Sequence, residues 1–164
     1  MADLRFAKLN ESWNADPNAP HPSVEQSGND ILLRFLLNSF QFKRFVEGDV
    51  GILRFRNCSR YRIDPTNDHA WFGGSCRYSA LAPGWGEFYE LVGDDPTLAT
   101  VSDWNMIGDK LPVARHFLFY FRDEMFECFA EDWSFEHVEA SPPPRLNTRP
   151  RFGQRWRNLL GLHR

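Results

Sequence analysis

One stretch of the chain constrains its fold more than any other, the alternating run from 115 to 136. It reads RHFLFYFRDEMFECFAEDWSFE, and large apolar side chains recur in it at every second position. Successive side chains of a strand point to opposite faces, so this period is typical of strands and not of helices. The polar break at 122–125 predicts that two long strands fold back on each other there.

This hairpin divides its side chains between two faces. Two-residue and four-residue loops give the same division, and we expect the longer loop because Asn-Gly and Asp-Gly are missing from the turn. On the other face, we expect His116 to lie opposite Glu131 and Tyr120 opposite Glu127. The face expected in the core holds Phe117, Phe119, Phe121, Phe126, Cys128 and Ala130.

Shorter runs indicate further strands, separated by clusters of turn residues. They predict a hairpin around Gly28, and a short helix near 102–107 with Ser102 as its N-cap. About eight to ten short strands predict a mainly-β fold, an antiparallel sandwich or a partly open barrel. The additional segments that we expect to be extended are 24–26, 30–37, 40–45, 50–56, 60–63, 70–72, 75–79 and 87–92.

Charge separates the chain into an acidic body and a basic tail. Residues 141–164 hold six arginines and no acidic residue, whereas the rest holds 13 basic and 22 acidic side chains. The body therefore carries −9, and with the tail this gives the overall −3. We expect an acidic β domain over 1–140, and a Pro/Arg-rich tail over 141–164 that is flexible or forms a short amphipathic helix at 153–162.

The tail has three interpretations, which the sequence leaves open. It is a solubilising extension, it contacts a membrane surface or nucleic acid, or it docks on an acidic patch of the body or of a partner. Arg155, Trp156 and Arg157 would make such contacts. No apolar run is long enough for a transmembrane segment, and the first 15 residues lack the apolar centre of a signal peptide, so we expect a cytoplasmic protein.

Two groups of residues could support chemistry. His116 with Glu131, flanked by Tyr120 and Glu127, would place a general base beside a carboxylate that orients it. With no nucleophile or set of metal ligands nearby in the sequence, we prefer an ordinary cross-strand charge pair.

Asp64, Asp68 and His69 are of metal-binding types, but the paired spacings of zinc sites, such as CxxC or HExxH, are missing. Turn hydrogen bonds are the alternative role for these side chains, and we expect no cofactor.

Four arginines follow one another at short intervals, at positions 54, 56, 60 and 62. Arginines interleaved with aromatic residues can bind single-stranded nucleic acid, but an acidic body repels phosphate. We therefore expect these arginines to pair with acidic residues on neighbouring strands. Trp71 and Phe72, next to two glycines, are candidates for a contact patch.

These observations predict a non-catalytic protein-binding module. An acidic β protein could mask a basic surface of a partner, as proteins that neutralise toxins do. The alternative is a small-ligand binding protein or a hydrolytic enzyme with a polar pocket at the mouth of the barrel. A polar pocket in the structure would favour the ligand, and a flat acidic or aromatic face would favour a protein partner.

Overall fold

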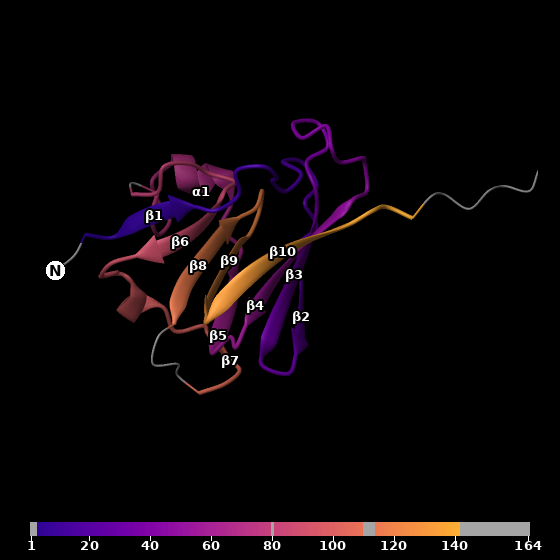
Figure 1. The fold of residues 1–164 in the computed structure, drawn as a ribbon. Coiled ribbons are helices and arrows are strands. Elements are labelled where there is room, and N and C mark those ends of the chain that lie inside the picture. Colours follow the sequence, from indigo (N-terminus) through magenta and orange to yellow (C-terminus); the bar gives the residue numbers. More distant parts are fainter. Residues whose placement is uncertain (1–2, 80, 110–113, 142–164) are drawn as a thin grey trace, which may run out of the picture.

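The computed structural model describes residues 3–79, 81–109 and 114–141, and ten strands within these ranges form two antiparallel sheets packed face to face (Figure 1). The predicted sandwich is confirmed, and the described strands do not close into a barrel. The six-stranded sheet has the order β1 (Arg5–Lys8), β6 (Phe88–Val92), β8 (Arg115–Tyr120), β9 (Met125–Ala130), β5 (Arg60–Asp64) and β7 (Asn105–Met106). The four-stranded sheet has the order β10 (Asp132–Val138), β4 (Val50–Arg56), β3 (Asp30–Leu36) and β2 (Ser23–Ser27).

The β8–β9 hairpin has the predicted faces but a different register. All six side chains expected in the core are buried in the cluster between the sheets. The predicted four-residue loop is wrong: the chain reverses at Arg122 and Asp123, and the amide of Phe121 donates a hydrogen bond to the carbonyl of Glu124 (2.8 Å). Phe117 therefore pairs with Cys128. A shift of two residues changes the partners of a strand without changing its faces.

The second half of the run at 115–136 crosses from one sheet to the other. β9 ends at Ala130, and after Glu131 the chain continues as β10, which pairs with β4. At this corner Asp132 accepts from Arg56 of β4 (2.6 Å) and from Arg115 of β8 (2.9 Å). The corner thus links the two sheets by charge as well as by the chain.

The core lies between the sheets and is dominated by aromatic rings. The predicted hairpin around Gly28 is confirmed, and it turns β3 so that Ile31, Leu33 and Phe35 face inward. Gly28 has a φ of 62°, a backbone conformation that glycine adopts readily. From the segment before β2, Trp13 stacks on Phe135 with ring centroids 4.3 Å apart.

A second layer covers the outer face of the six-stranded sheet. We call it the cover, residues 65–79 and 81–87, and it contains α1 (Asp68–Phe72), visible above β1 in Figure 1. The strand expected at 70–72 is wrong, because Asn67 caps a helix there by accepting from the amide of Ala70 (2.9 Å). The strand expected at 75–79 is wrong too, because these residues form turns. The buried outer cluster consists of Trp71, Tyr78, Tyr89, Leu91, Leu118, Tyr120 and Met125.

Two further expectations need correction. Residues 40–45 form turns and no strand. Residues 102–107 hold the short strand β7 where a helix was expected, and a 3-10 turn, η1 (Leu98–Thr100), precedes this strand.

Among the described residues, no helix is long and apolar enough to cross a membrane. The helix expected at 153–162 and the tail residues lie outside the described ranges.

Candidate functional site

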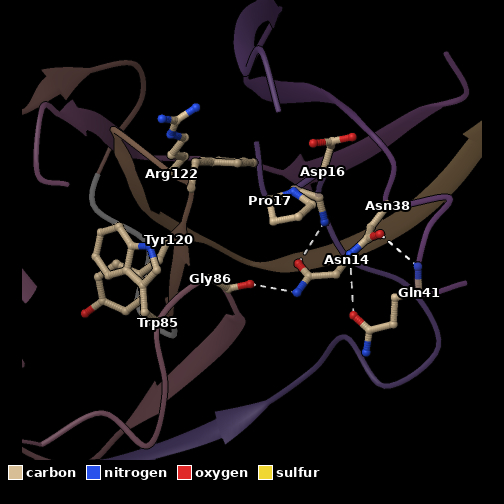
Figure 2. A pocket seen from close by; sticks show the side chains of 11 residues that line it. Asn14, Asp16, Pro17, Asn38, Gln41, Trp85, Gly86, Tyr120 and Arg122 are labelled. Carbon is tan, nitrogen blue, oxygen red and sulfur yellow. Dashed lines mark hydrogen bonds between the residues drawn. The ribbon is translucent and has the colours of Figure 1, made fainter. Parts of the chain in front are cut away.

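A pocket of about 300 Å³ lies at the end of the sandwich where four loops meet (Figure 2). We call it the end pocket. Its lining comes from segments that are far apart in the sequence: residues 14–17, residues 38 and 41, residues 85–86, and residues 120–122. Figure 2 shows the rings of Trp85 and Tyr120 on one side, with Asn14, Asn38 and Gln41 on the other.

Hydrogen bonds fix the polar side of the end pocket in place. Asn14 donates from Nδ2 to the carbonyl of Gly86 (2.8 Å), and its Oδ1 accepts from the amide of Ala15 (2.8 Å). Asn38 accepts at Oδ1 from the amides of Phe40 and Gln41 (3.1 and 3.0 Å), and its own amide donates to the carbonyl of Asn14 (2.9 Å). These bonds join the two loops and hold both side-chain amides in one orientation.

Two opposite charges stand at the rim of the end pocket. Asp16 accepts at Oδ1 from the amides of Asn18 and Ala19 (2.8 and 2.9 Å), and no described residue donates to its Oδ2. Arg122 donates from Nη1 to the carbonyl of Asn18 (2.8 Å). The rim therefore carries an accepting and a donating group of opposite charge, and Arg122 also pairs with Asp123 (3.7 Å).

The aromatic side of the end pocket is a stack of rings. The ring of Trp85 lies over Tyr120 with centroids 4.8 Å apart, and Trp71 packs against Tyr120 at 4.9 Å. The Tyr120 hydroxyl is buried without a hydrogen-bond partner among the described residues, and burial raises its pKa well above the usual value. It therefore stays protonated, and this side of the pocket is largely apolar.

The residues predicted as a catalytic face are only partly brought together. His116 Nε2 lies 2.6 Å from Glu127 Oε1, and the imidazole stacks on Phe129 with centroids 4.2 Å apart. Glu131 does not meet His116, because it is exposed and accepts from Asn57 (2.5 Å). Tyr120 is on the same face of the sheet but makes no hydrogen bond to Glu127.

Glu127 is the centre of a buried ionic network that ties the cover to the sheet. Its carboxylate accepts from Arg77 of the cover (2.8 Å) and lies 3.3 Å from Arg62 of β5. Burial alone would raise the pKa of Glu127, but the hydrogen bonds and charges of His116 and Arg77 outweigh burial and hold it below the usual value. These side chains are already paired with one another, so the network is suited to holding two layers together.

Sequence reasoning anticipated part of this network. Arg62 pairs with an acidic residue on the next strand as expected, and so do Arg54 with Asp30 (3.2 Å) and Arg56 with Asp132 (2.6 Å). The expectation is wrong for Arg60, whose guanidinium lies over the rings of Trp104 and Phe129. Arg77 and its second partner, Asp95 (3.2 Å), were missed. They lie in irregular segments where no strand pattern indicates a partner.

The metal candidates occupy ordinary structural positions. Asp64 pairs with Arg62 and accepts from Thr66, while Asp68 and His69 lie in the single turn of α1. No group of three potential metal ligands gathers anywhere in the described ranges.

The residues predicted to form contacts with a partner do not lie together. Trp71 is buried in the outer cluster, whereas Phe72 is 78% exposed, so the two do not form a common patch. Arg155, Trp156 and Arg157 fall in the part of the chain that the structure does not describe.

A wider hollow of about 800 Å³ lies beside the start of β1. Its described lining combines Leu4, Leu81 and Leu98 with the acidic residues Asp3, Asp94 and Asp95. The carboxylate of Asp95 is already engaged by Arg77, Tyr78 and Thr97. The end pocket, with donors, acceptors and rings around one space, is the better candidate for a binding site.

Comparison of the chain with protein-family models, curated proteins and solved structures found no match.

Proposed function

We propose that this chain is a non-catalytic binding protein and that the end pocket is its binding site. The observation that carries the proposal is the arrangement of fixed amide groups opposite an aromatic wall, around a volume of about 300 Å³. Ligand pockets are concave, partly aromatic, and orient their ligand with a few well-placed polar groups. Groups that are already held in position lose little freedom on binding, which favours affinity.

Binding is better supported than catalysis by the way the titratable groups are used. His116 and Glu127 are bonded to each other inside the ionic network, and neither lines the end pocket. Tyr120 does line it, but its raised pKa makes it a poor proton acceptor at neutral pH. The pocket thus offers recognition groups where a reaction would need an activated base or nucleophile.

A fragment screen on the full chain tests this proposal. We expect some polar fragments to shift the side-chain amide signals of Asn14, Asn38 and Gln41 and the indole signal of Trp85 in ¹H–¹⁵N NMR spectra. The indole signal of Trp104, which packs on Phe129 away from the pocket, serves as the internal control. Shifts confined to other regions, or no shifts with any fragment, would contradict the proposal.

A protein partner is a second candidate, and two exposed side chains favour it. Phe40 is 67% exposed and Val46 is 61% exposed, and both belong to the loop that supplies Asn38 and Gln41 to the end pocket. A partner that covered this end would bury them, and a basic partner surface would suit the acidic body. Phe40→Ser should then abolish capture of the partner without changing fragment binding, whereas Phe72→Ser should leave capture unchanged.

A further inference from the structure

We infer that the end pocket binds a neutral sugar ring, an inference that deepens the proposed function and rests on it. Three features of the pocket carry it: the opposite charges at the rim, the aromatic wall, and the acceptor and donor atoms that remain without a partner.

The rim charges favour a ligand without net charge. An anion placed near Arg122 would also meet the carboxylate of Asp16, and a cation placed near Asp16 would meet the guanidinium of Arg122. Like charges that line the same pocket cost binding energy, so neither ion matches the whole rim. A neutral ligand with hydroxyl groups can donate to the carboxylate of Asp16 and accept from the guanidinium of Arg122.

The available hydrogen-bonding atoms match hydroxyl groups in particular. Oδ2 of Asp16 and Nε2 of Gln41 have no partner among the described residues, so one acceptor and one donor remain for a ligand. A hydroxyl both donates and accepts, and a sugar carries several of them around one ring. Hydrogen bonds to a charged group are the stronger ones, which makes the contact to Asp16 the most important.

The wall formed by Trp85 suits the apolar side of the same ring. The face of an aromatic ring is electron-rich, and the C–H groups on one side of a sugar are weakly positive. The ring of Trp85 packs against Tyr120 and against Trp71, whose ring centroid is 5.7 Å away. The wall is therefore rigid before a ligand arrives.

The size of the pocket limits the ligand to about one ring. A volume of about 300 Å³ is at the lower end of the range for ligand pockets. A single ring makes few contacts, so we expect a dissociation constant on the order of 1 mM, and tighter binding only if a longer chain of sugars extends past the rim.

Saturation-transfer NMR on the full chain tests the inference with glucose, galactose, mannose and N-acetylglucosamine as probes, and with inorganic phosphate and butylammonium as charged controls. We expect at least one sugar to bind and neither ion to do so. Asp16→Asn, which keeps the Oδ1 atom that accepts from Asn18 and Ala19, should weaken sugar binding about tenfold, and Gln41→Ala about threefold to tenfold. Gln26→Ala, an exposed change on β2, is the matched control and should have no effect.

The outcomes separate this inference from the proposed function. If fragments shift the pocket signals but no sugar binds, or if only an ion binds, the inference of a sugar ligand is wrong and the proposed binding site stands. Sugar binding that is equal in Asp16→Asn and in the unchanged chain also overturns the inference. If neither fragments nor sugars shift the pocket signals, both proposals fall.

Discussion

Glu127 is the residue whose replacement should cost the most stability for the least change in shape. It is fully buried, and its carboxylate is shared by Arg77 of the cover, Arg62 of β5 and His116 of β8. Glu127→Gln removes the buried carboxylate that these three side chains share, although Arg62 keeps Asp64 and Asp103 and Arg77 keeps Asp95. We therefore expect a loss of about 3 kcal/mol in the free energy of unfolding, the lower end for breaking a buried ion pair. Urea denaturation at pH 7 measures it. Glu131→Gln, an exposed change, should stay within about 0.5 kcal/mol, and an equal effect of both would refute this role for Glu127.

The same carboxylate should make the fold sensitive to acid. The pKa of Glu127 lies below its ordinary value of 4.5 in the folded chain, so the unfolded chain takes up the proton first. Stability should therefore be full above that value and decline as the pH falls through it towards the folded pKa. The free energy of unfolding measured from pH 7 to pH 3 should decline less steeply in Glu127→Gln. A profile that is flat, or that rises on acidification, would contradict this assignment.

The three cysteines should differ in reactivity because they differ in burial. Cys58 and Cys128 are buried in the core, where burial raises the pKa of the Cys128 thiol, whereas Cys76 in the cover is partly exposed. The hydrogen bond with Cys128 lowers the pKa of the Cys58 thiol, but a reagent cannot reach a buried sulfur. A thiol reagent should therefore label one site in the folded chain and three after denaturation. Cys76→Ser should remove the fast-reacting site. Rapid labelling that persists in this variant would show that the core thiols are accessible.

At the scale of single elements, close packing between β3 and β4 gives a sharp test at Gly51. A Cβ atom added there would lie 2.7 Å from the ring of Phe35 and 2.9 Å from Leu37, so neighbouring side chains must move. We expect Gly51→Ala to destabilise the fold by about 1–3 kcal/mol in urea denaturation. Gly84→Ala is the matched control, since its added Cβ would make only an ordinary contact at 3.6 Å with the Tyr89 hydroxyl. If Gly51→Ala leaves the free energy of unfolding unchanged, the side chains around residue 51 are packed less tightly than this.

The elements that could be predicted are those whose own sequence fixes their structure. The alternation in β8 and β9 gave the buried face correctly because a strand repeats every two residues, but the register was wrong because a shift by two preserves that face. α1 was missed although Asn67 is a typical N-cap, because five residues are too few to show a helical period. The crossing at Glu131 has no local signal and follows from how the two sheets pack.

At the scale of the whole molecule, the end pocket could not have been predicted from the sequence. Asn14, Asn38, Trp85 and Arg122 lie in four loops, and only the packed sandwich brings these loops to one end. Asn14 and Asn38 alone indicate only turns, in which asparagine is common, and nothing in the sequence places Trp85 or Arg122 beside them. The ionic network was partly predictable, because Arg62 and Glu127 face each other on paired strands, whereas Arg77 reaches Glu127 from an irregular segment.

The cover and the sandwich beneath it should unfold locally at different free energies. α1 is too short to be stable alone, so the cover depends on the outer cluster and on the bond from Arg77 to Glu127. In native-state hydrogen exchange, the amides of Trp71 and Gly73 should therefore exchange through an opening of lower free energy than the amides of Leu33 and Leu53 in the sandwich.

Arg77→Met keeps an apolar side chain over the sheet but removes its charge and hydrogen bonds, so cover amides should exchange faster while sandwich amides change less. Arg34→Met, which removes a surface pair with Glu25 (3.5 Å), should alter neither set. Equal protection of both layers, before and after Arg77→Met, would show that the cover and the sandwich unfold as one unit and that the buried pair does not control the opening of the cover.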